Sequence, residues 1–459
     1  MMREPAFSLL KKPAPTALRG KRVLVLGLGD TGLSVADWVK GQGGSVCIAD
    51  TRKAPPRKKD FSGEFHGGKF KASLLKGIDL LCISPGLSLE EDLVQDAMAK
   101  GIPVVGDIEL FAWAAKGKRL AVTGTNGKST VTALTGHLMR AAGIDCEVAG
   151  NISPPALAAL AKRKGPPAAW VLELSSYQLE TTWSLEPDAA AMLNLSEDHL
   201  DRYAGLAEYA AAKARIFMGA GTQVLNRCDS ASMALSIPGR AQVTFGLDAP
   251  DMAEDFGLAD DWLVRGRERL LRVAELPSPG MHNVSNALAA CALAHQAGVP
   301  LAALAPGLRS FKGLPHRMQR VRLRGGVEWL DDSKGTNVGA TVAALNGLQK
   351  KAVLILGGEG KGQNFAPLAS VIRAHAKHVL LIGRDAALIE KALAASQVPA
   401  ERIESMAGAV ARAAQVAAPG DAVLLSPACA SFDMFRDYRH RAEVFVEEVL
   451  RLQAAGGAS

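Results

Sequence analysis

The sequence has few aromatic residues, no clustered cysteines and no long apolar run. Aromatic residues make up 5% of the 459 residues, so stacking platforms for single-stranded nucleic acid are not expected. The six cysteines lie far apart, without a C-x-x-C pair or a Cys/His cluster, which disfavours structural zinc and a disulfide framework. Residues 287–306, the longest apolar candidate, are interrupted by polar residues and proline. The first 20 residues contain no apolar stretch of signal-peptide length, so we expect a cytoplasmic protein without membrane insertion.

The charge balance of the chain is mildly basic. Its 53 Lys and Arg residues exceed its 46 Asp and Glu residues by 7, which favours anionic partners weakly. The densest basic run, residues 52–59, contains Pro55 and Pro56, so we interpret it as a loop and expect no nucleic-acid partner. The 46 glycines are about 10% of the chain, above the usual ~7%, and they indicate tight turns or phosphate-binding loops. The length predicts roughly three domains.

Short apolar runs alternate with helical stretches in three successive blocks, which begin near residues 22, 118 and 314. This βαβ rhythm predicts an α/β fold with parallel sheets. We expect helices from the first glycine turn to about residue 42, over 129–142 and over 206–217. The expected strands are residues 22–26, 45–49, 80–83, 102–105, 119–122, 170–174, 189–193, 223–225, 327–330, 353–356, 379–382 and 423–425.

The first strand runs into a glycine-rich turn. Gly27, Gly29 and Gly32 form a G-x-G-x-x-G pattern, and Asp50 ends the next strand. This context is typical of dinucleotide-binding domains, in which a helix N-terminus faces phosphate and an acid contacts a ribose hydroxyl. A nucleotide-sugar diphosphate fits the same geometry, and a plain βα turn is a further alternative. Candidate ligand residues on this edge are Gly29, Thr31, Gly32, Asp50, Thr51, Arg52, Ser84 and Gly86.

A second glycine-rich loop lies between the strand at 119–122 and the following helix. It reads Gly124-Thr125-Asn126-Gly127-Lys128-Ser129-Thr130. Backbone N–H groups of such a loop bind phosphate, Lys128 can reach the terminal phosphates, and Ser129 or Thr130 can hold Mg²⁺. The loop is shorter than a strict Walker A motif. A chain with both loops is not a simple dehydrogenase.

Two further segments carry candidate nucleotide or metal ligands. Glu173 ends a strand in the second block, where a carboxylate is well placed for Mg²⁺, although a buried ion-paired glutamate is the alternative. Asn283 and Asn286 lie three residues apart on one helix face. They could bind an adenine edge or a ribose, and helix capping is the alternative.

The loop at 124–130 resembles the phosphate loop of the muramyl (Mur) ligases and of folylpolyglutamate synthases. These ATP-dependent enzymes join an amino acid to a carboxylate through an acyl phosphate. The resemblance extends from Gly27 to Arg441, through the segments 194–201, 280–286, 311–318, 331–337 and 426–435. It implies a Rossmann-like domain at 1–107 for the UDP moiety, a P-loop-type ATP-binding domain at 108–313 and a Rossmann-like domain at 314–459 for the amino acid. Domain closure is expected to assemble the site, because Lys128 and Lys334 lie in different blocks.

The resemblance also implies a role for individual residues. The catalytic residues would be Lys128, His199, Lys213, Arg317 and Lys334, with Lys213 carbamylated. ATP would bind at 124–130, Asn283, Asn286, Arg317, Asp332 and Lys334. Mg²⁺, expected as two ions, would bind at Ser129, Glu173, His199 and Lys213. Asn151 and His199 would contact the UDP-linked substrate, and Thr336, Lys361, Ser431, Phe432 and Tyr438 would contact the amino acid. Asp30, Gly335 and Ala442 depart from the family pattern.

Residues 426–435 favour the branch that adds D-glutamate. The implied reaction joins D-glutamate to the alanyl carboxylate of UDP-N-acetylmuramoyl-L-alanine in peptidoglycan precursor synthesis, and we expect a monomer. One alternative is a Mur ligase that adds L-alanine. A nicotinamide-dependent dehydrogenase using Gly27 to Asp50 would leave Lys128 and Lys334 without a role. A regulator that only binds nucleotide would release no phosphate.

Overall fold

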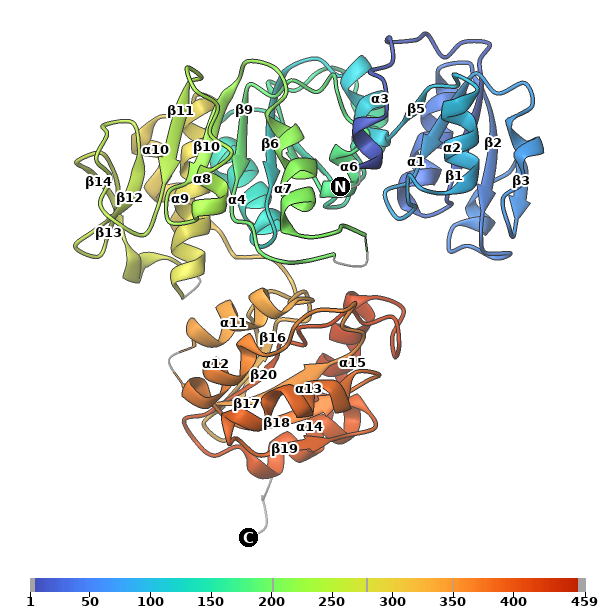
Figure 1. Ribbon diagram of the computed structural model, residues 1–459. Helices are drawn as coiled ribbons and strands as arrows, with labels where there is room; N and C mark the ends of the chain where they lie inside the picture. Colours follow the sequence, from blue (N-terminus) through green and yellow to red (C-terminus); the bar gives the residue numbers. More distant parts are fainter. Residues whose placement is uncertain (1–4, 200–201, 278–279, 349, 453–459) are drawn as a thin grey trace. The chain divides into compact units, whose positions relative to one another are not determined.

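The computed structural model describes residues 5–199, 202–277, 280–348 and 350–452 (Figure 1). The chain forms two compact units. The first comprises residues up to Leu195 together with Gly205–Leu271 and Asn286–Leu308. The second comprises Ser196–Ala204, Arg272–Ser285 and the residues from Arg309 onward.

The N-terminal sheet, coloured blue in Figure 1, has the strand order β3-β2-β1-β4-β5, and all its neighbouring pairs are parallel. The order changes direction between β1 and β4, so the turn after β1 lies at the topological switch point, where ligands of such sheets bind. Its strands are β1 (Arg22–Leu26), β2 (Ser45–Asp50), β3 (Glu64–Gly67), β4 (Leu80–Ile83) and β5 (Val104–Val105). Its helices are α1 (Asp30–Gly41), α2 (Asp92–Ala99) and α3 (Asp107–Ala114).

The central sheet has the order β14-β13-β12-β11-β10-β9-β6-β8-β7. Its strands are β6 (Lys118–Thr123), β7 (Cys146–Gly150), β8 (Ala169–Glu173), β9 (Ala189–Met192), β10 (Thr222–Asn226), β11 (Gln242–Phe245), β12 (Phe256–Ala259), β13 (Trp262–Arg265) and β14 (Glu268–Arg272). The helices are α4 (Lys128–Ala141), α5 (Ala156–Lys162), α6 (Ser176–Leu179), α7 (Leu206–Ala214), α8 (Ser230–Met233), α9 (Met281–Gln296) and α10 (Leu301–Ser310). From the edge strand β7 to β12, in the order of the sheet, all neighbouring strands pair in parallel, whereas β12 and β13 are antiparallel.

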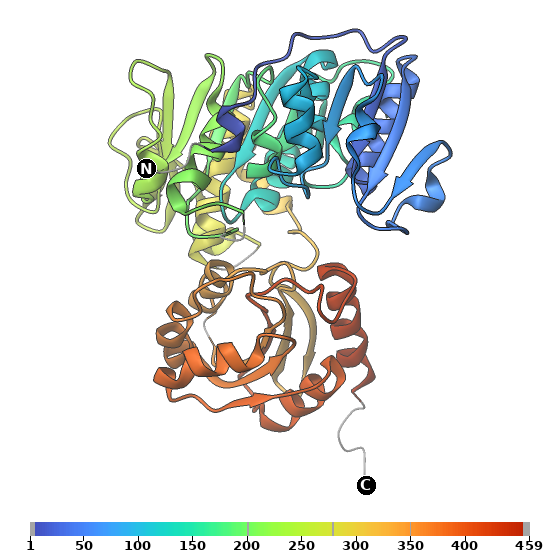
Figure 2. The same ribbon diagram turned by 45° about the vertical axis from the view of Figure 1, so that its right-hand side comes forward.

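The C-terminal sheet has the order β15-β16-β20-β17-β18-β19 and carries helices on both faces (Figure 2). Only the edge strand β15 runs antiparallel to its neighbour among the described pairs. The strands are β15 (Gln319–Arg324), β16 (Val327–Asp331), β17 (Ala352–Gly357), β18 (Ala376–Ile382), β19 (Ala400–Arg402) and β20 (Ala422–Leu425). The helices are α11 (Val338–Asn346), α12 (Pro367–His375), α13 (Ala386–Leu393), α14 (Met406–Val416) and α15 (Tyr438–Arg451).

The predicted α/β fold with parallel sheets is confirmed. Each expected strand is present, although the one predicted at 102–105 is confined to Val104–Val105. The helix expected over 206–217 ends at Ala214, and a 3₁₀ turn covers Arg215–Phe217. The extension of the central sheet by β12 to β14 and the edge strand β15 were not predicted, because their short mixed sequences lack a continuous apolar run.

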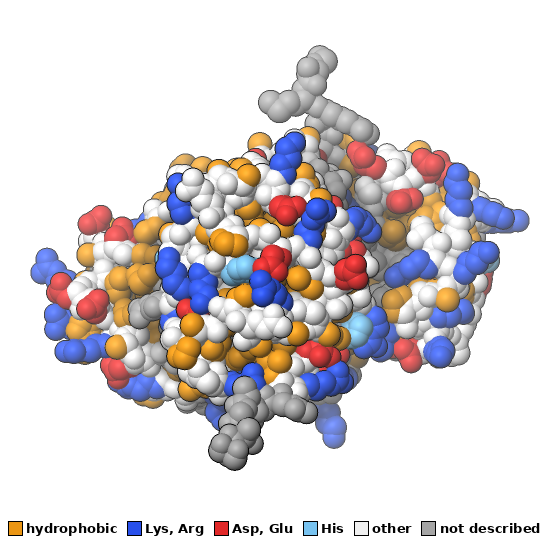
Figure 3. All heavy atoms as spheres, turned by 90° about the horizontal axis from the view of Figure 1, so that it is seen from below, with side chains coloured by type: hydrophobic (Ala, Val, Ile, Leu, Met, Phe, Trp, Pro, Cys, Tyr) orange, Lys and Arg blue, Asp and Glu red, His pale blue; other side chains and the backbone are white. Residues whose placement is uncertain are grey.

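Two observations concern the surface. Among the described residues, no helix combines the length and the apolar character that spanning a bilayer requires. On the face drawn in Figure 3, Lys and Arg side chains are interspersed with Asp and Glu. On this face the basic side chains therefore do not form a single continuous patch.

Candidate active site

The loop between β6 and α4 is the predicted phosphate-binding loop. Gly127 has a φ of 86°, a backbone region that favours glycine. A Cβ atom at Gly127 would lie 2.4 Å from Oδ1 of Asn286. Asn286 on α9 is thus brought against the loop.

The side-chain amide of Asn194 forms two hydrogen bonds with the backbone of this loop. The backbone N–H of Asn126 donates to Oδ1 of Asn194 at 2.8 Å, and Nδ2 of Asn194 donates back to the Asn126 carbonyl at 3.1 Å. The backbone N–H of Thr125 donates to the Asn194 carbonyl at 2.9 Å. We assigned Asn194 no role from the sequence. Its position just beyond β9, at the edge where the parallel strands end, was the available signal.

Lys128 lies folded over the same loop. Its Nζ donates to the Gly124 carbonyl at 2.9 Å and to the Thr125 carbonyl at 2.7 Å. Ser129, the next residue, is 7% exposed. A cation and a hydroxyl therefore stand side by side at the N-terminus of α4, the arrangement that suits an anion together with a metal.

Glu173 supplies a buried carboxylate beside the loop. It pairs in register with Val122 of β6, so both residues stand near the carboxyl edge of the sheet. Its Oε1 accepts from Nδ2 of Asn151 at 2.7 Å. Its Oε2 is buried and has no hydrogen-bond partner among the described residues. An unpaired buried oxygen carries a large desolvation cost unless a cation or donor occupies the site, so Glu173 and Ser129 fit the oxygen ligands that Mg²⁺ prefers.

Lys213 on α7 reaches the same edge from another side. It is 1% exposed, and its Nζ lies 3.4 Å from Oγ1 of Thr123, the last residue of β6. Its Nζ also lies 4.6 Å from the centre of the Tyr209 ring. The structure therefore brings Lys128, Ser129, Glu173, Asn151 and Lys213 together around the ends of β6 and β8.

In the N-terminal domain, both oxygens of Asp50 are used internally. Oδ2 accepts from the Leu28 N–H at 2.8 Å, and Arg52 Nε and Nη2 donate to Oδ1 and Oδ2, each at 2.8 Å. These bonds lower the pKa of Asp50 although burial, the largest influence, opposes them. Asp50 thus orients the glycine turn and Arg52. The Arg52 side chain is 54% exposed, whereas that of Asp50 is 2% exposed.

The glycine turn itself is tightly packed. A Cβ atom at Gly32 would lie 1.9 Å from the Gly27 carbonyl oxygen, and one at Gly27 would lie 2.9 Å from Oγ of Ser84. The turn and Ser84 therefore share one edge, as predicted. Asp30, one of the three departures from the family pattern, forms a 3.2 Å ion pair with Arg57, which offsets its negative charge near this turn.

Asp332 is the central acid of the second unit. It is 7% exposed, accepts from Ser426 Oγ at 2.8 Å and accepts from the Met318 N–H at 3.3 Å. Burial raises its pKa to about 7, against the opposing influence of Ser426 and Arg317. A Cβ atom at Gly335 would lie 2.7 Å from Oδ2 of Asp332, so the glycine at this departure leaves room for the carboxylate.

Lys334 and Tyr438 stack against each other. Lys334 Nζ lies 3.8 Å from the centre of the Tyr438 ring. The Lys334 N–H donates to the His316 carbonyl at 3.2 Å, and His316 Nδ1 lies 2.7 Å from Oδ2 of Asp331. The segment 311–318 therefore contacts the segment 331–337 at Lys334. The Asp331–His316 pair was not predicted, because 15 residues separate its members.

The predicted amino-acid-binding segments also meet. Glu359 and Ala430 exchange backbone hydrogen bonds of 3.0 and 2.9 Å, which joins the loop carrying Lys361 to the segment carrying Ser431. Lys361 has a φ of 51° and Ser431 is 3% exposed. Phe432 differs, because its side chain is 66% exposed and buries little against this segment.

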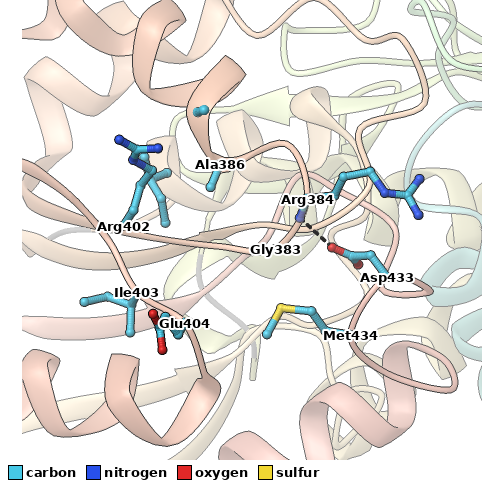
Figure 4. Close-up of a pocket in the computed structure, with 10 residues that line it drawn as sticks. Gly383, Arg384, Ala386, Arg402, Ile403, Glu404, Asp433 and Met434 are labelled. Carbon is cyan, nitrogen blue, oxygen red and sulfur yellow. Dashed lines mark hydrogen bonds between the residues drawn. The ribbon is translucent and has the colours of Figure 1, made fainter.

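A shallow cavity of about 630 Å³ opens next to these segments, beyond the ends of β18 and β19 (Figure 4). The backbone N–H of Arg384 donates to Oδ2 of Asp433 at 2.8 Å across its wall. Arg402, Glu404 and Met434 complete the rim. Its walls carry both charge signs, and none of the predicted ligand residues lines it.

The predicted site residues His199 and Arg317, and the departure Ala442, belong to the second unit. Nε2 of His199 lies 3.8 Å from Oδ2 of Asp198, which accepts from Asn337 Nδ2 at 3.2 Å. Burial lowers the pKa of His282, and the positive charge of Arg317 lowers it further. Arg317 therefore lies close to His282. Ala442, the third departure, is fully buried. Leu200 and Asp201, part of the family-like segment 194–201, lie outside the described residues.

Comparison with known proteins bears on this arrangement. The family model described as "Mur ligase MurD-like, N-terminal domain" matches residues 21–106. The "Mur ligase middle domain" matches 122–294, and the "Mur ligase, glutamate ligase domain" matches 316–429. The chain belongs to the Mur ligase family. Its three sheets correspond to the three Mur ligase domains, while the exact boundaries at 107 and 313 stay predictions.

Curated relatives place the chain more closely within the Mur ligases. A protein of Nitrosospira multiformis is 53% identical over 96% of this chain and 98% of its own length. A protein of Thiobacillus denitrificans is 53% identical over 95% of this chain and 98% of its own. Both are named UDP-N-acetylmuramoylalanine–D-glutamate ligase. The predicted resemblance to the D-glutamate-adding branch is confirmed.

Solved structures support the fold. The UDP-N-acetylmuramate-alanine ligase of Thermotoga maritima aligns with a TM-score of 0.61 at 20% identity, over 94% of this chain and 99% of that one. A pseudomurein peptide ligase of Methanothermus fervidus aligns with a TM-score of 0.61 at 19% identity, over 94% and 100%. At these identities the likeness concerns architecture alone.

Proposed function

We propose that this chain is an ATP-dependent ligase that joins D-glutamate to the alanyl carboxylate of UDP-N-acetylmuramoyl-L-alanine, a step of peptidoglycan precursor synthesis. The observation that carries the proposal is the braced phosphate loop with its buried acid, Glu173, in a chain half identical to ligases of that name. We further propose that the enzyme acts as a cytoplasmic monomer without a nucleic-acid partner.

ATP would bind with its phosphates on the loop 124–130. Backbone N–H groups and Lys128 would face the phosphates, since Lys128 is already held at the loop by two carbonyls. Asn286 contacts the loop, and we assign it and Asn283 to the adenosine part. Asp332 would accept a ribose hydroxyl, and Arg317 and Lys334 would offset charge on the transferred phosphate.

Magnesium would be held by Glu173 and Ser129 on the first unit, and by His199 at a second ion. Glu173 Oε2 is a buried oxygen in need of a cation, and the donor set of carboxylate and hydroxyl suits a hard ion. When bound, Mg²⁺ reduces the repulsion between the substrate carboxylate and the triphosphate. Asn151 donates a hydrogen bond to Glu173 and so orients the Glu173 carboxylate. We expect Asn151 to contact the UDP-linked substrate as well.

Lys213 would act as a carbamate. Its neutral amine attacks CO₂, an N–C bond forms, and one proton leaves to solvent. The side chain thereby becomes an anion next to Thr123. An anion at this position complements the cations of the site better than a buried ammonium would.

The acceptor substrate would bind to the N-terminal domain through its diphosphate. Arg52, oriented by Asp50, offers a guanidinium for the uridine diphosphate, and the turn at Gly29 to Gly32 offers a helix N-terminus. Thr51, Ser84 and Gly86 lie on the same edge of the sheet. D-Glutamate would bind between Thr336, Lys361, Ser431, Phe432 and Tyr438 in the second unit.

The reaction then has two steps. An oxygen of the alanyl carboxylate attacks the γ-phosphorus in line, the bond to the β-phosphate oxygen breaks, and ADP leaves with the bonding electrons. The amine of D-glutamate attacks the acyl phosphate and forms a tetrahedral intermediate. This intermediate expels inorganic phosphate, and the amine proton passes to solvent or a nearby base.

Phosphate release tests the proposal. The full chain is incubated with ATP, Mg²⁺ and UDP-N-acetylmuramoyl-L-alanine, and either D- or L-glutamate is added. We expect phosphate and a new amide only with the D-enantiomer. Activity on UDP-N-acetylmuramate with L-alanine would favour the L-alanine-adding alternative. A change in NADH absorbance with no phosphate release would favour the dehydrogenase, and ATP binding without turnover would favour a regulator.

A further inference from the structure

Three potential metal ligands converge at the outer edge of the N-terminal sheet. Cys47 of β2 pairs in register with Glu64 of β3, and His66 follows two residues later on the same strand. Alternate residues of a strand face the same side, so the three side chains share one face. One ligand atom from each lies within 4.8 Å of the other two, and His66 Nε2 is 3.2 Å from Glu64 Oε1.

We propose that Cys47, Glu64 and His66 bind one divalent ion of the zinc type, with solvent completing its coordination. A thiolate, an imidazole and a carboxylate form a mixed sulfur, nitrogen and oxygen set. Zn²⁺ and Co²⁺ accept such a set in tetrahedral geometry, whereas Mg²⁺ and Ca²⁺ prefer oxygen alone. The site is separate from the proposed magnesium ligands and does not depend on the proposed function.

The burial of the three side chains provides a route for the ion. The side chains of Glu64 and His66 are about half exposed, while Cys47 lies beneath them at 2% exposure. An ion therefore arrives from solvent at the imidazole and carboxylate and meets the sulfur from above. Binding breaks the S–H bond, forms a metal–sulfur bond and releases one proton to the buffer.

Metal binding at this cluster requires the Cys47 thiol to lose its proton, because the thiolate is the form that ligates a metal. A divalent ion supplies the positive charge that the thiolate needs. Proton release should therefore accompany binding, and affinity should rise with pH.

The guanidinium of Arg22 would compete with a metal ion for the Glu64 carboxylate. Its Nη2 donates to Glu64 Oε2 at 2.8 Å and to Oε1 at 3.1 Å. The Arg22 side chain is 44% exposed, so it can turn into solvent when an ion takes its place. Removing this guanidinium should therefore strengthen ion binding, whereas a purely structural role for the cluster predicts weaker folding instead.

Cobalt titration of the reduced full chain, in chelator-treated buffer without nucleotide, tests the site. We expect one Co²⁺ per chain, with the near-ultraviolet thiolate-to-cobalt absorption and the visible bands of a four-coordinate ion. Zn²⁺ should abolish both signals, and a large excess of Mg²⁺ should not. The proton released per ion is measured in weakly buffered solution.

Matched variants distinguish the site from incidental binding. His66→Ala and Cys47→Ala should weaken Co²⁺ binding at least tenfold, and Arg22→Gln should strengthen it. Cys228→Ser is the control, because Cys228 is the exposed cysteine among the described residues. If Cys47→Ala fails to fold, the exposed His66→Ala variant decides. A thiolate band that is absent, that survives in His66→Ala or that disappears in Cys228→Ser would overturn the proposal.

Discussion

The guanidinium of Arg441 donates from Nη2 to the carbonyl oxygen of Ser333 at 2.8 Å. Its Nε donates to Ser333 Oγ at 3.0 Å, and its Nη1 donates to the Cys429 carbonyl at 3.1 Å. Arg441 is 1% exposed. One buried side chain of α15 thus ties the segment carrying Lys334 to the segment carrying Ser431.

Arg441→Lys should destabilise the chain and slow catalysis together. A lysine cannot reproduce three diverging hydrogen bonds, and it leaves buried carbonyls unpaired. We expect a loss of about 3 kcal/mol in the free energy of unfolding, typical of a broken buried charged network, measured by denaturant titration. Arg436→Lys, at an exposed position just before α15, is the control. Wild-type stability of the Arg441 variant would contradict the tie.

Lys128→Ala should lower turnover by roughly 10²-fold or more, because one charge contact to the transferred phosphate is lost. The measurement is phosphate release at saturating substrates, with the circular dichroism spectrum as a check of folding. Lys116→Ala, an exposed lysine just before β6, should retain full activity. Undiminished turnover in Lys128→Ala would remove the phosphate-loop assignment.

Glu173→Gln should raise the Mg²⁺ concentration needed for half-maximal activity. The amide keeps the size of the side chain and its bond to Asn151, yet it removes the charge that holds a hard cation. We expect a shift of roughly tenfold or more, as for other ligand-shell substitutions, measured by Mg²⁺ titration of phosphate release. Glu147→Gln on β7 is the control. An unchanged Mg²⁺ requirement would exclude Glu173 as a ligand.

Asp107→Asn should alter how stability depends on pH. Burial raises the pKa of Asp107 to about 6, only partly opposed by the hydrogen bond from Gln178. Between about pH 4 and pH 6 the folded state binds more protons than the unfolded state, so wild-type stability falls as pH rises through this window. The variant should lack this fall, worth roughly 3 kcal/mol. The measurement is the free energy of unfolding of both proteins as a function of pH. Curves that run parallel would contradict this prediction.

Much of the fold followed from local patterns. The apolar runs before Gly27 and Gly124 predicted β1 and β6, because a parallel strand buried on both faces must be apolar along its length. Glycine placement then located the loops at the strand ends. The strands β12 to β14 escaped prediction, since their pairing partners, rather than their own composition, make them strands.

The amino-acid sequence alone was sufficient to locate the glycine-rich loop at 124–130, the acid at the end of β8 and the family to which the chain belongs. The packed tertiary structure alone decided which side chains lie next to this loop and this acid and hydrogen-bond to them. Asn194 locks the loop from 68 residues away, Arg441 reaches Ser333 across 108, and Cys47 meets His66 only through strand pairing. Short motifs can be recognised from the sequence because their chemistry depends on backbone groups that are neighbours along the chain. Contacts over long separations depend on how packed sheets and helices close upon one another.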